Sequence, residues 1–108
     1  MRWEILYYNK KLEEDILSLP KTLVAKYFHY TEIMERLGAD LGMPHTKLLG
    51  NGLLELRLKG KEGIARVFYM TQVGKKIMML HCVIKKTQKT PLQALKVARN
   101  RLKEVLRS

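Results

Sequence analysis

The sequence predicts an α+β domain in which one strand and two helices precede three strands and a last helix. Apolar residues recur at period two in some segments, as in strands, and at three- or four-residue steps in others, as in helices. The chain has 108 residues, of which 46% are hydrophobic, and this is enough for one packed core but too little for two. We therefore expect a single domain spanning residues 1–108.

The N-terminal part reads as a strand followed by two helices. Residues 2–8 alternate aromatic or aliphatic side chains with charged ones, which predicts a strand. Asn9 can cap a short helix that runs to about residue 19. Residues 21–37 then carry apolar side chains at helical spacing, and Gly38 suits a C-terminal cap, so this segment is the second helix.

Three strands follow and form an antiparallel meander. Residues 53–59 alternate leucine with charged side chains, which predicts a strand with one wet face. Glycine-containing turns separate it from residues 64–71 and from residues 76–85. The last of these segments is the most apolar, so we expect it to be the central strand.

The chain ends in a helix with a well-marked start. Thr90 can cap it, Pro91 suits the first helical position, and Gln93 can complete a capping box. Residues 95–106 carry an apolar stripe flanked by lysine and arginine. The predicted order is therefore strand, helix, helix, three-stranded antiparallel meander, helix.

The whole chain has a net charge of +11, and its basic side chains are concentrated in the later part. Residues 1–40 contain six Lys or Arg and seven Asp or Glu, whereas residues 41–108 contain 15 basic and three acidic side chains. Such an excess of like charge opposes compaction and favours an anionic partner, of which nucleic acid is the commonest. A solvated basic face and an anionic membrane surface are the alternatives, but the last helix has only part of the pattern of a membrane-docking helix.

Other chemistries find little support. The single cysteine, Cys82, excludes an intramolecular disulfide and a zinc site built on cysteines. The three histidines show no metal-ligand spacing, and there is no Gly-rich phosphate loop, so we expect no metal and no cofactor. The N-terminus shows no signal sequence, and the longest apolar run, residues 77–84, is too short to span a membrane, which predicts a cytoplasmic protein without membrane contact.

Cationic side chains gather on the three predicted strands. Arg57 lies on the first and Arg66 on the second, and His81, Lys85, Lys86 and Lys89 lie at the end of the third. Of these six, Lys89 more readily attracts a phosphate than reacts. If Arg57 and Arg66 share a face, they flank one groove. Single exposed strand cations are ordinary, but like charges placed together destabilise a sheet unless an anion binds them. The other five residues are therefore the candidate active site.

The same region contains five motifs in a fixed order. They are residues 41–49 (LGMPHTKLL), 52–57 (GLLELR), 66–69 (RVFY), 80–81 (LH) and 85–91 (KKTQKTP). This set resembles the phage-derived HigB-like family of the RelE/ParE superfamily of type II toxins. Leu54 and the Cys82–Val83 pair depart from the family pattern, both at hydrophobic strand positions.

The resemblance implies a RelE-like fold and a toxin that inhibits translation and growth by cleaving mRNA, usually on the ribosome. It also implies neutralisation by a cognate antitoxin, typically one with a helix-turn-helix DNA-binding domain. The partners expected for this chain are therefore an antitoxin, mRNA and the ribosome.

RNA cleavage without a metal is chemically feasible, because RNA carries its own nucleophile, the 2′-OH. Arg66 is the first choice for holding the scissile phosphate, since a guanidinium can bind two oxygens at once, and Arg57 is the second. His81, Lys85 and Lys86 are the candidates for proton transfer. A histidine satisfied beneath a helix is the alternative for His81.

Four further side chains are candidates for RNA binding without a chemical role. They are Lys47, Lys59, Tyr69 and Lys89. The lysines can attract backbone phosphates, and Tyr69 can either stack on a base or fill the core, the core being favoured.

Two other functions stay open. One is a non-catalytic module that binds RNA or the ribosome through the same basic face. The other is a ParE-type toxin that acts on DNA gyrase; that branch generally lacks the cationic set, so the cluster of Arg57, Arg66 and Lys85 argues against it.

Overall fold

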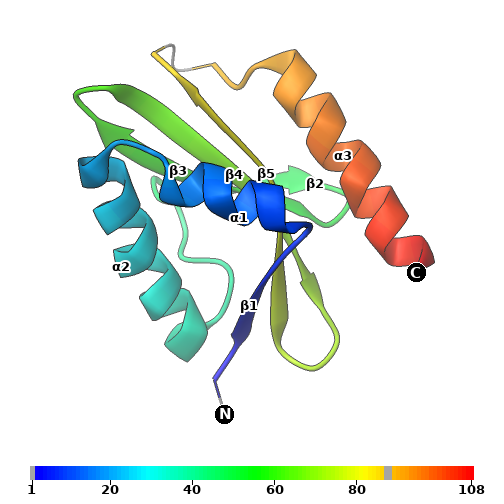
Figure 1. Ribbon diagram of the computed structural model, residues 1–108. Coiled ribbons are helices and arrows are strands. Elements are labelled where there is room, and N and C mark those ends of the chain that lie inside the picture. The colour runs from blue at the N-terminus through cyan, green and yellow to red at the C-terminus, as the bar shows by residue number, and fades with distance from the viewer. Residues whose placement is uncertain (1, 87–88) are drawn as a thin grey trace.

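The computed structural model describes residues 2–86 and 89–108 (Figure 1). In chain order the elements are β1 (Glu4–Tyr7), α1 (Lys10–Leu17), α2 (Lys21–Leu37), β2 (Thr46–Gly50), β3 (Leu53–Gly60), β4 (Gly63–Gln72), β5 (Lys76–Lys85) and α3 (Leu92–Arg107). Residues 87 and 88 of the last sequence motif lie outside the described part of the chain.

The strands form one mixed sheet in the order β1-β5-β4-β3-β2. β1 runs parallel to β5, and all other neighbours are antiparallel. The α+β prediction is confirmed. The expected central strand is not: β4, buried from Gly63 to Met70, occupies the centre, and β5 lies beside it.

β2 is a strand that the apolar pattern alone does not reveal. It has five residues and ends at Gly50, so it offers too little alternation to stand out. Its hairpin with β3 turns at Asn51 and Gly52, whose φ angles of 53° and 86° are the left-handed values that an Asn-Gly turn adopts. The predicted three-stranded meander is therefore a four-stranded one.

The ends of the first two helices follow the sequence closely. The Asn9 side chain accepts a hydrogen bond from the Leu12 N–H at 2.8 Å, so the predicted cap is present. Gly38, at φ 110°, ends α2, and its N–H donates to the Met34 carbonyl at 2.8 Å. A positive φ at this position is why glycine suits it.

The predicted capping box of the last helix is wrong. Pro91 occupies the cap position of α3, and no side chain caps the helix. The Thr90 hydroxyl instead donates to a carboxylate oxygen of Glu55 at 2.8 Å. A buried carboxylate gains more from this donor than an exposed helix end does, because an unpaired charge inside the protein carries a large desolvation penalty.

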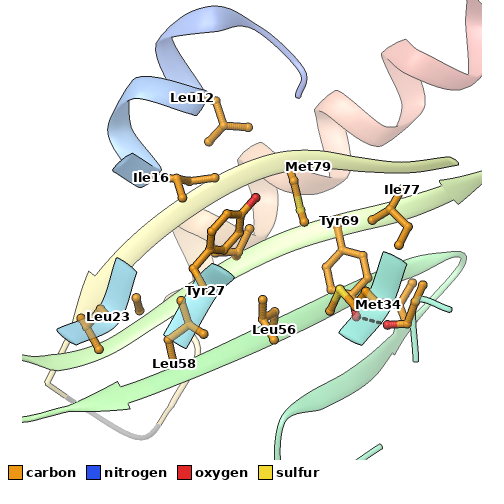
Figure 2. Close-up of a cluster of buried hydrophobic side chains, with 14 residues drawn as sticks. Leu12, Ile16, Leu23, Tyr27, Met34, Leu56, Leu58, Tyr69, Ile77 and Met79 are labelled. Carbon is orange, nitrogen blue, oxygen red and sulfur yellow. Dashed lines mark hydrogen bonds between the residues drawn. The ribbon is translucent and has the colours of Figure 1, made fainter. Parts of the chain in front are cut away.

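α1 and α2 cover one face of the sheet with a continuous apolar core (Figure 2). Side chains from the helices meet side chains from the strands there: Leu12, Ile16, Leu23, Tyr27 and Met34 against Leu56, Leu58, Tyr69, Ile77 and Met79. The hydroxyls of Tyr7 and Tyr27 are 2.8 Å apart, so the polar tip of the buried Tyr27 is hydrogen-bonded.

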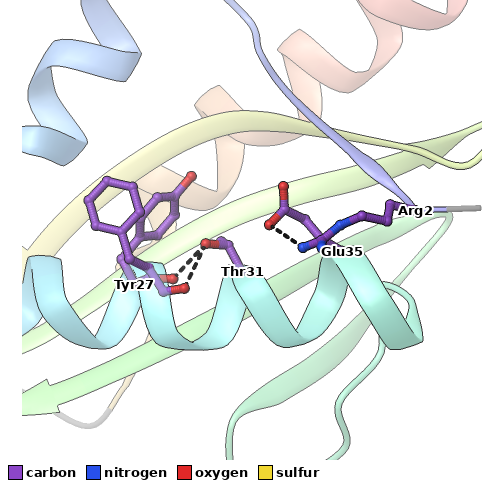
Figure 3. Close-up of polar contacts among 5 residues, drawn as sticks. Arg2, Tyr27, Thr31 and Glu35 are labelled. Atoms are coloured by element: carbon purple, nitrogen blue, oxygen red, sulfur yellow. Dashed lines mark hydrogen bonds and ion pairs between the residues drawn. The ribbon is translucent and has the colours of Figure 1, made fainter.

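Polar contacts hold α2 against the N-terminal strand (Figure 3). The Trp3 N–H donates to the Glu35 carbonyl at 2.8 Å, and Arg2 reaches the Glu35 carboxylate at 3.4 Å. Within the helix the buried Thr31 hydroxyl donates to the Tyr27 carbonyl at 2.9 Å. The exposed ion pair contributes at most about 1 kcal/mol, so the packing carries most of this contact.

α3 packs on the opposite face of the sheet. Its buried residues Ala94, Ala98 and Leu102 meet Leu53, Phe68, Met70 and Leu80. Arg101 of α3 donates to the Leu80 carbonyl at 2.7 Å and lies 4.5 Å from the centre of the Tyr8 ring. Small alanines in the contact let the helix approach the strands closely.

The two N-terminal helices and the strand cations lie on opposite faces of the sheet. α1 and α2 carry five acidic and five Lys or Arg side chains, so their charges balance. The strand cations at Arg57 and Arg66 lie on the α3 face, as their pairing shows below. No helix in residues 2–86 or 89–108 is long and apolar enough to cross a membrane.

Replacement of Leu56 by alanine should lower the free energy of unfolding by about 2–5 kcal/mol, because a fully buried leucine leaves a cavity when truncated. Urea unfolding followed by circular dichroism measures it. Leu48→Ala on β2 is the matched control: this side chain is 66% exposed, and the change should stay within about 0.5 kcal/mol. Equal losses in both variants would contradict the packing described.

Candidate functional site

The pairing of the strands brings most of the predicted site residues to one face of the sheet. Arg57 on β3 is paired with Arg66 on β4, which is paired with Val83 on β5. Paired residues of antiparallel strands project to the same side, and so do residues two apart along a strand. Two neighbouring rows therefore share this face: Lys47, Glu55, Phe68 and His81 in one, and Lys59, Ile64 and Lys85 in the other. The expected common face of Arg57 and Arg66 is confirmed.

A buried carboxylate organises the two arginines. Glu55 is fully buried, and its Oε1 accepts a hydrogen bond from the Arg57 Nε at 2.8 Å. Its Oε2 accepts the Thr90 hydroxyl at 2.8 Å and lies 3.6 Å from the Arg66 Nε. We call Glu55, Arg57, Arg66 and Thr90 the Glu55 cluster. Because one negative charge faces two guanidinium groups, the cluster keeps a net positive charge that can attract an anion.

Burial perturbs the ionisation of Arg66, which has no exposed surface. Desolvation lowers the pKa of its guanidinium, the Glu55 carboxylate opposes this, and the nearby Arg57 charge adds to the lowering. An arginine nevertheless stays charged at neutral pH. Arg66 therefore acts as a fixed positive charge behind the surface.

Arg57 is more exposed than Arg66, which reverses the order in which the two were expected to hold the scissile phosphate. The Arg57 side chain is 16% exposed, whereas Arg66 is fully covered. Arg57 is thus the guanidinium that solvent and a bound anion can reach in this structure. The sequence pattern could not show this, because both residues alternate in the same way along their strands.

A hollow of about 470 Å³ opens beside the Glu55 cluster, lined by Lys85, Lys89, Thr90, Pro91 and Leu92. Thr90 belongs to both, so the hollow adjoins the buried carboxylate. Lys85 is exposed at the end of β5 and pairs with Ile64, two residue pairs beyond Arg66 and therefore on the same face. Two lysines at the rim of a concave surface suit the binding of a phosphate-bearing ligand.

His81 lies in the neighbouring row, beside Phe68. The two ring centres are 6.3 Å apart and the planes nearly parallel. Burial lowers the pKa of His81, and the positive charge of Arg101 lowers it further, so the ring is neutral at pH 7. Its described neighbours are the Phe68 ring and the charge of Arg101 on α3, and its role in proton transfer stays a prediction.

The remaining predicted residues divide between surface and core. Lys47, Lys59, Lys86 and Lys89 are all exposed, as RNA-binding or proton-transferring side chains must be. Tyr69 is not: it is fully buried on the opposite face, and its hydroxyl donates to the Ala39 carbonyl at 2.6 Å (Figure 2). Base stacking does not fit that position, because both faces of the ring are covered by core side chains.

Glu55 and Thr90 are members of the cluster that the sequence analysis leaves out. A signal for Glu55 exists, since strand alternation puts it on the same face as Arg57, two positions away. Thr90 carries no comparable signal, because its contact joins residues 35 positions apart.

Metal-binding groups do not assemble in the part of the chain that the structure describes: no three His, Cys, Asp or Glu residues of residues 2–86 and 89–108 lie together as a possible site. Cys82 is half-buried against the α1 and α2 face. Burial raises the pKa of its thiol to about 12, so it is protonated and unreactive at neutral pH.

The fold is similar to solved toxin structures. The YoeB dimer from Staphylococcus aureus gives a TM-score of 0.58 and 22% sequence identity over 79% of this chain and 99% of that chain. The archaeal RelE–RelB complex from Pyrococcus horikoshii gives a TM-score of 0.58 and 20% identity over 82% and 100% of the two chains. At this level of identity the likeness establishes the fold, which is the predicted RelE-like one.

Sequence comparison assigns the family. No curated protein is significantly similar to the chain in sequence. A family profile of the phage-derived Gp49-like proteins matches residues 14–103, from α1 into the last turns of α3, and so includes the whole Glu55 cluster. The expected resemblance to a phage-derived family is thereby confirmed, and the chain belongs to the phage-derived Gp49-like protein family.

Proposed function

We propose that this chain is the toxin of a type II toxin–antitoxin pair and that it inhibits translation by cleaving mRNA, on the ribosome in the cytoplasm. The observation that carries the proposal is the Glu55 cluster: two paired arginines held by one buried carboxylate, beside a hollow rimmed by Lys85 and Lys89. The similar folds of YoeB and RelE, solved in complexes with YefM and RelB, support the same conclusion.

The chemistry requires no group beyond the RNA and the side chains. The 2′-oxygen attacks the adjacent phosphorus, the bond from phosphorus to the 5′-oxygen breaks, and a 2′,3′-cyclic phosphate and a 5′-hydroxyl result. The 2′-OH proton passes to a base, and the leaving 5′-oxygen takes a proton from an acid. Charge on the phosphorane oxygens is what a fixed guanidinium stabilises.

Side chains take roles according to their exposure. Arg57 contacts the scissile phosphate, and Arg66 supports it with a second positive charge from behind. Lys85 and Lys86 are the candidates that can protonate the leaving oxygen, because both are exposed next to this row. His81, neutral at pH 7 and half-buried, is placed to accept a proton only if the RNA reaches the next row.

Arg57→Lys should lower the rate of RNA cleavage by about a hundredfold or more while the protein stays folded. The substitution keeps the charge but removes the planar donor pair that binds two phosphate oxygens. The matched control is Lys61→Gln, an exposed cation in the turn between β3 and β4 whose loss should change cleavage little. The assay measures cleavage of mRNA in a purified translation system.

The outcomes separate the three functions. Full cleavage by Arg57→Lys would refute the assigned site. RNA binding without cleavage by the parent chain would favour the non-catalytic module, and inhibition of DNA gyrase without RNA cleavage would favour a ParE-type toxin. Arg66→Ala is a poor probe of the site. It removes one of the positive charges that stabilise the buried Glu55 carboxylate, and so it destabilises the fold.

We further propose a cognate antitoxin, of the helix-turn-helix type, that covers the Glu55 cluster and the hollow beside it. The basic surface around them favours capture by acidic side chains. Antitoxin and a short uncleavable RNA should then compete for the free toxin, as measured by fluorescence anisotropy of labelled RNA. Simultaneous binding of both would show that the antitoxin acts elsewhere, for example by making the toxin too large for the ribosome.

A further inference from the structure

A small cationic cavity lies at the edge of the sheet, on the side away from the hollow at Lys85. It has a volume of about 110 Å³ and is lined by Lys26, Tyr30, Pro44, His45, Arg57 and Lys59. We call it the edge pocket. It forms beyond the first residue of β2. That residue, Thr46, pairs with Leu56 and so makes the outermost pair of the β2–β3 ladder, and α2 faces the edge of β3 beyond this pair.

Backbone contacts fix the shape of the edge pocket. The Arg57 N–H donates to the His45 carbonyl at 2.9 Å, which holds the segment before β2 against the edge of β3. The Lys26 ammonium donates to the Lys59 carbonyl, which holds this cation at the strand edge. Segments from three parts of the chain therefore meet in a fixed arrangement rather than by the chance approach of long side chains.

The lining has an unbalanced charge. Lys26, Arg57 and Lys59 are cationic, and none of the six lining residues is acidic. Gathering like charges is unfavourable unless an anion occupies the site. At about 30 Å³ for each water, the cavity has the room of three to four waters, which suits a phosphate group better than a nucleoside.

The walls suit the sugar–phosphate backbone of RNA. The Tyr30 and His45 rings lie 4.7 Å apart at 35° and give the pocket an aromatic side next to its cations. Arg57 joins the two sites: it lines the edge pocket, and its Nε binds Glu55 in the Glu55 cluster. A phosphate in the pocket therefore lies next to the place where the cleaved phosphate is proposed to bind.

We propose that the edge pocket is a second phosphate site, which binds a backbone phosphate of the RNA neighbouring the one that is cleaved. Lys26 and His45 are its specific residues, and neither belongs to the Glu55 cluster. The assignment to RNA rests on the proposed function, whereas the affinity for phosphate is a property of the pocket itself. The two can therefore be tested separately.

The first experiment uses inorganic phosphate as the probe and nuclear magnetic resonance as the readout. Titration of the full chain should shift the resonances of Tyr30 and His45, and Lys26→Gln and His45→Gln should each weaken the binding severalfold. The matched control is Lys21→Gln, which removes a charge from an exposed position on the same helix and should leave the titration unchanged. Equal titrations in all four proteins, or no shift at Tyr30 and His45, would overturn the pocket.

The second experiment uses an RNA blocked against cleavage by 2′-O-methyl groups. Each phosphate neutralised contributes about −0.7 to the slope of log affinity against log salt for single strands. Lys26→Gln should make that slope less negative by roughly this amount, and Lys26→Arg, which keeps the charge, should restore it. A parental slope for Lys26→Gln would remove the assignment to RNA. Loss of phosphate binding in Lys26→Gln supports the pocket even if the parent chain cuts no RNA. Absence of RNA cleavage by the parent chain would refute the proposed function but not the phosphate site.

Discussion

The buried ion pairing of Glu55 is the interaction on which the functional face depends. A carboxylate without exposed surface is unstable unless donors or opposite charges surround it. Here Arg57 and Thr90 donate hydrogen bonds to Glu55, and Arg66 forms an ion pair with it. Removing one partner of such a pair typically lowers stability by about 3–5 kcal/mol. The cluster thereby links β3, β4 and the residue before the cap of α3, and it leaves 16% of the Arg57 side chain exposed.

The two faces of the sheet differ in how much apolar surface they bury. On the α1 and α2 face, apolar side chains form the larger core, and the two helices there carry as many acidic as basic side chains. On the other face α3 packs over Leu53, Phe68, Met70 and Leu80, and Val83 of the Arg57 row also packs against this cluster. Lys59 and Lys85, in the next row, are exposed, so a positive surface is available there.

Strand alternation allowed the face of the candidate site to be predicted, because Arg57 and its leucine neighbours follow period two without interruption. The Asn9 cap and the Gly38 helix end were predictable for a similar reason, since each depends on local backbone chemistry. β2 was not predicted from its apolar residues, because five residues give too short a pattern, although Asn51 and Gly52 mark its turn. Burial of Arg66, the Thr90 contact and the edge pocket depend on residues far apart in sequence, and local periodicity carries no information about them.

The nature of the RNA ends after cleavage tests the central claim most directly. Purified chain is incubated with messenger RNA and ribosomes, and the new ends are mapped and tested for their chemistry. Attack by the 2′-OH predicts 2′,3′-cyclic phosphate and 5′-hydroxyl ends, and a 2′-deoxy substitution at the cleaved position should prevent the cut. Ends that carry a 5′-phosphate, cleavage at the 2′-deoxy position, or intact message would contradict the account.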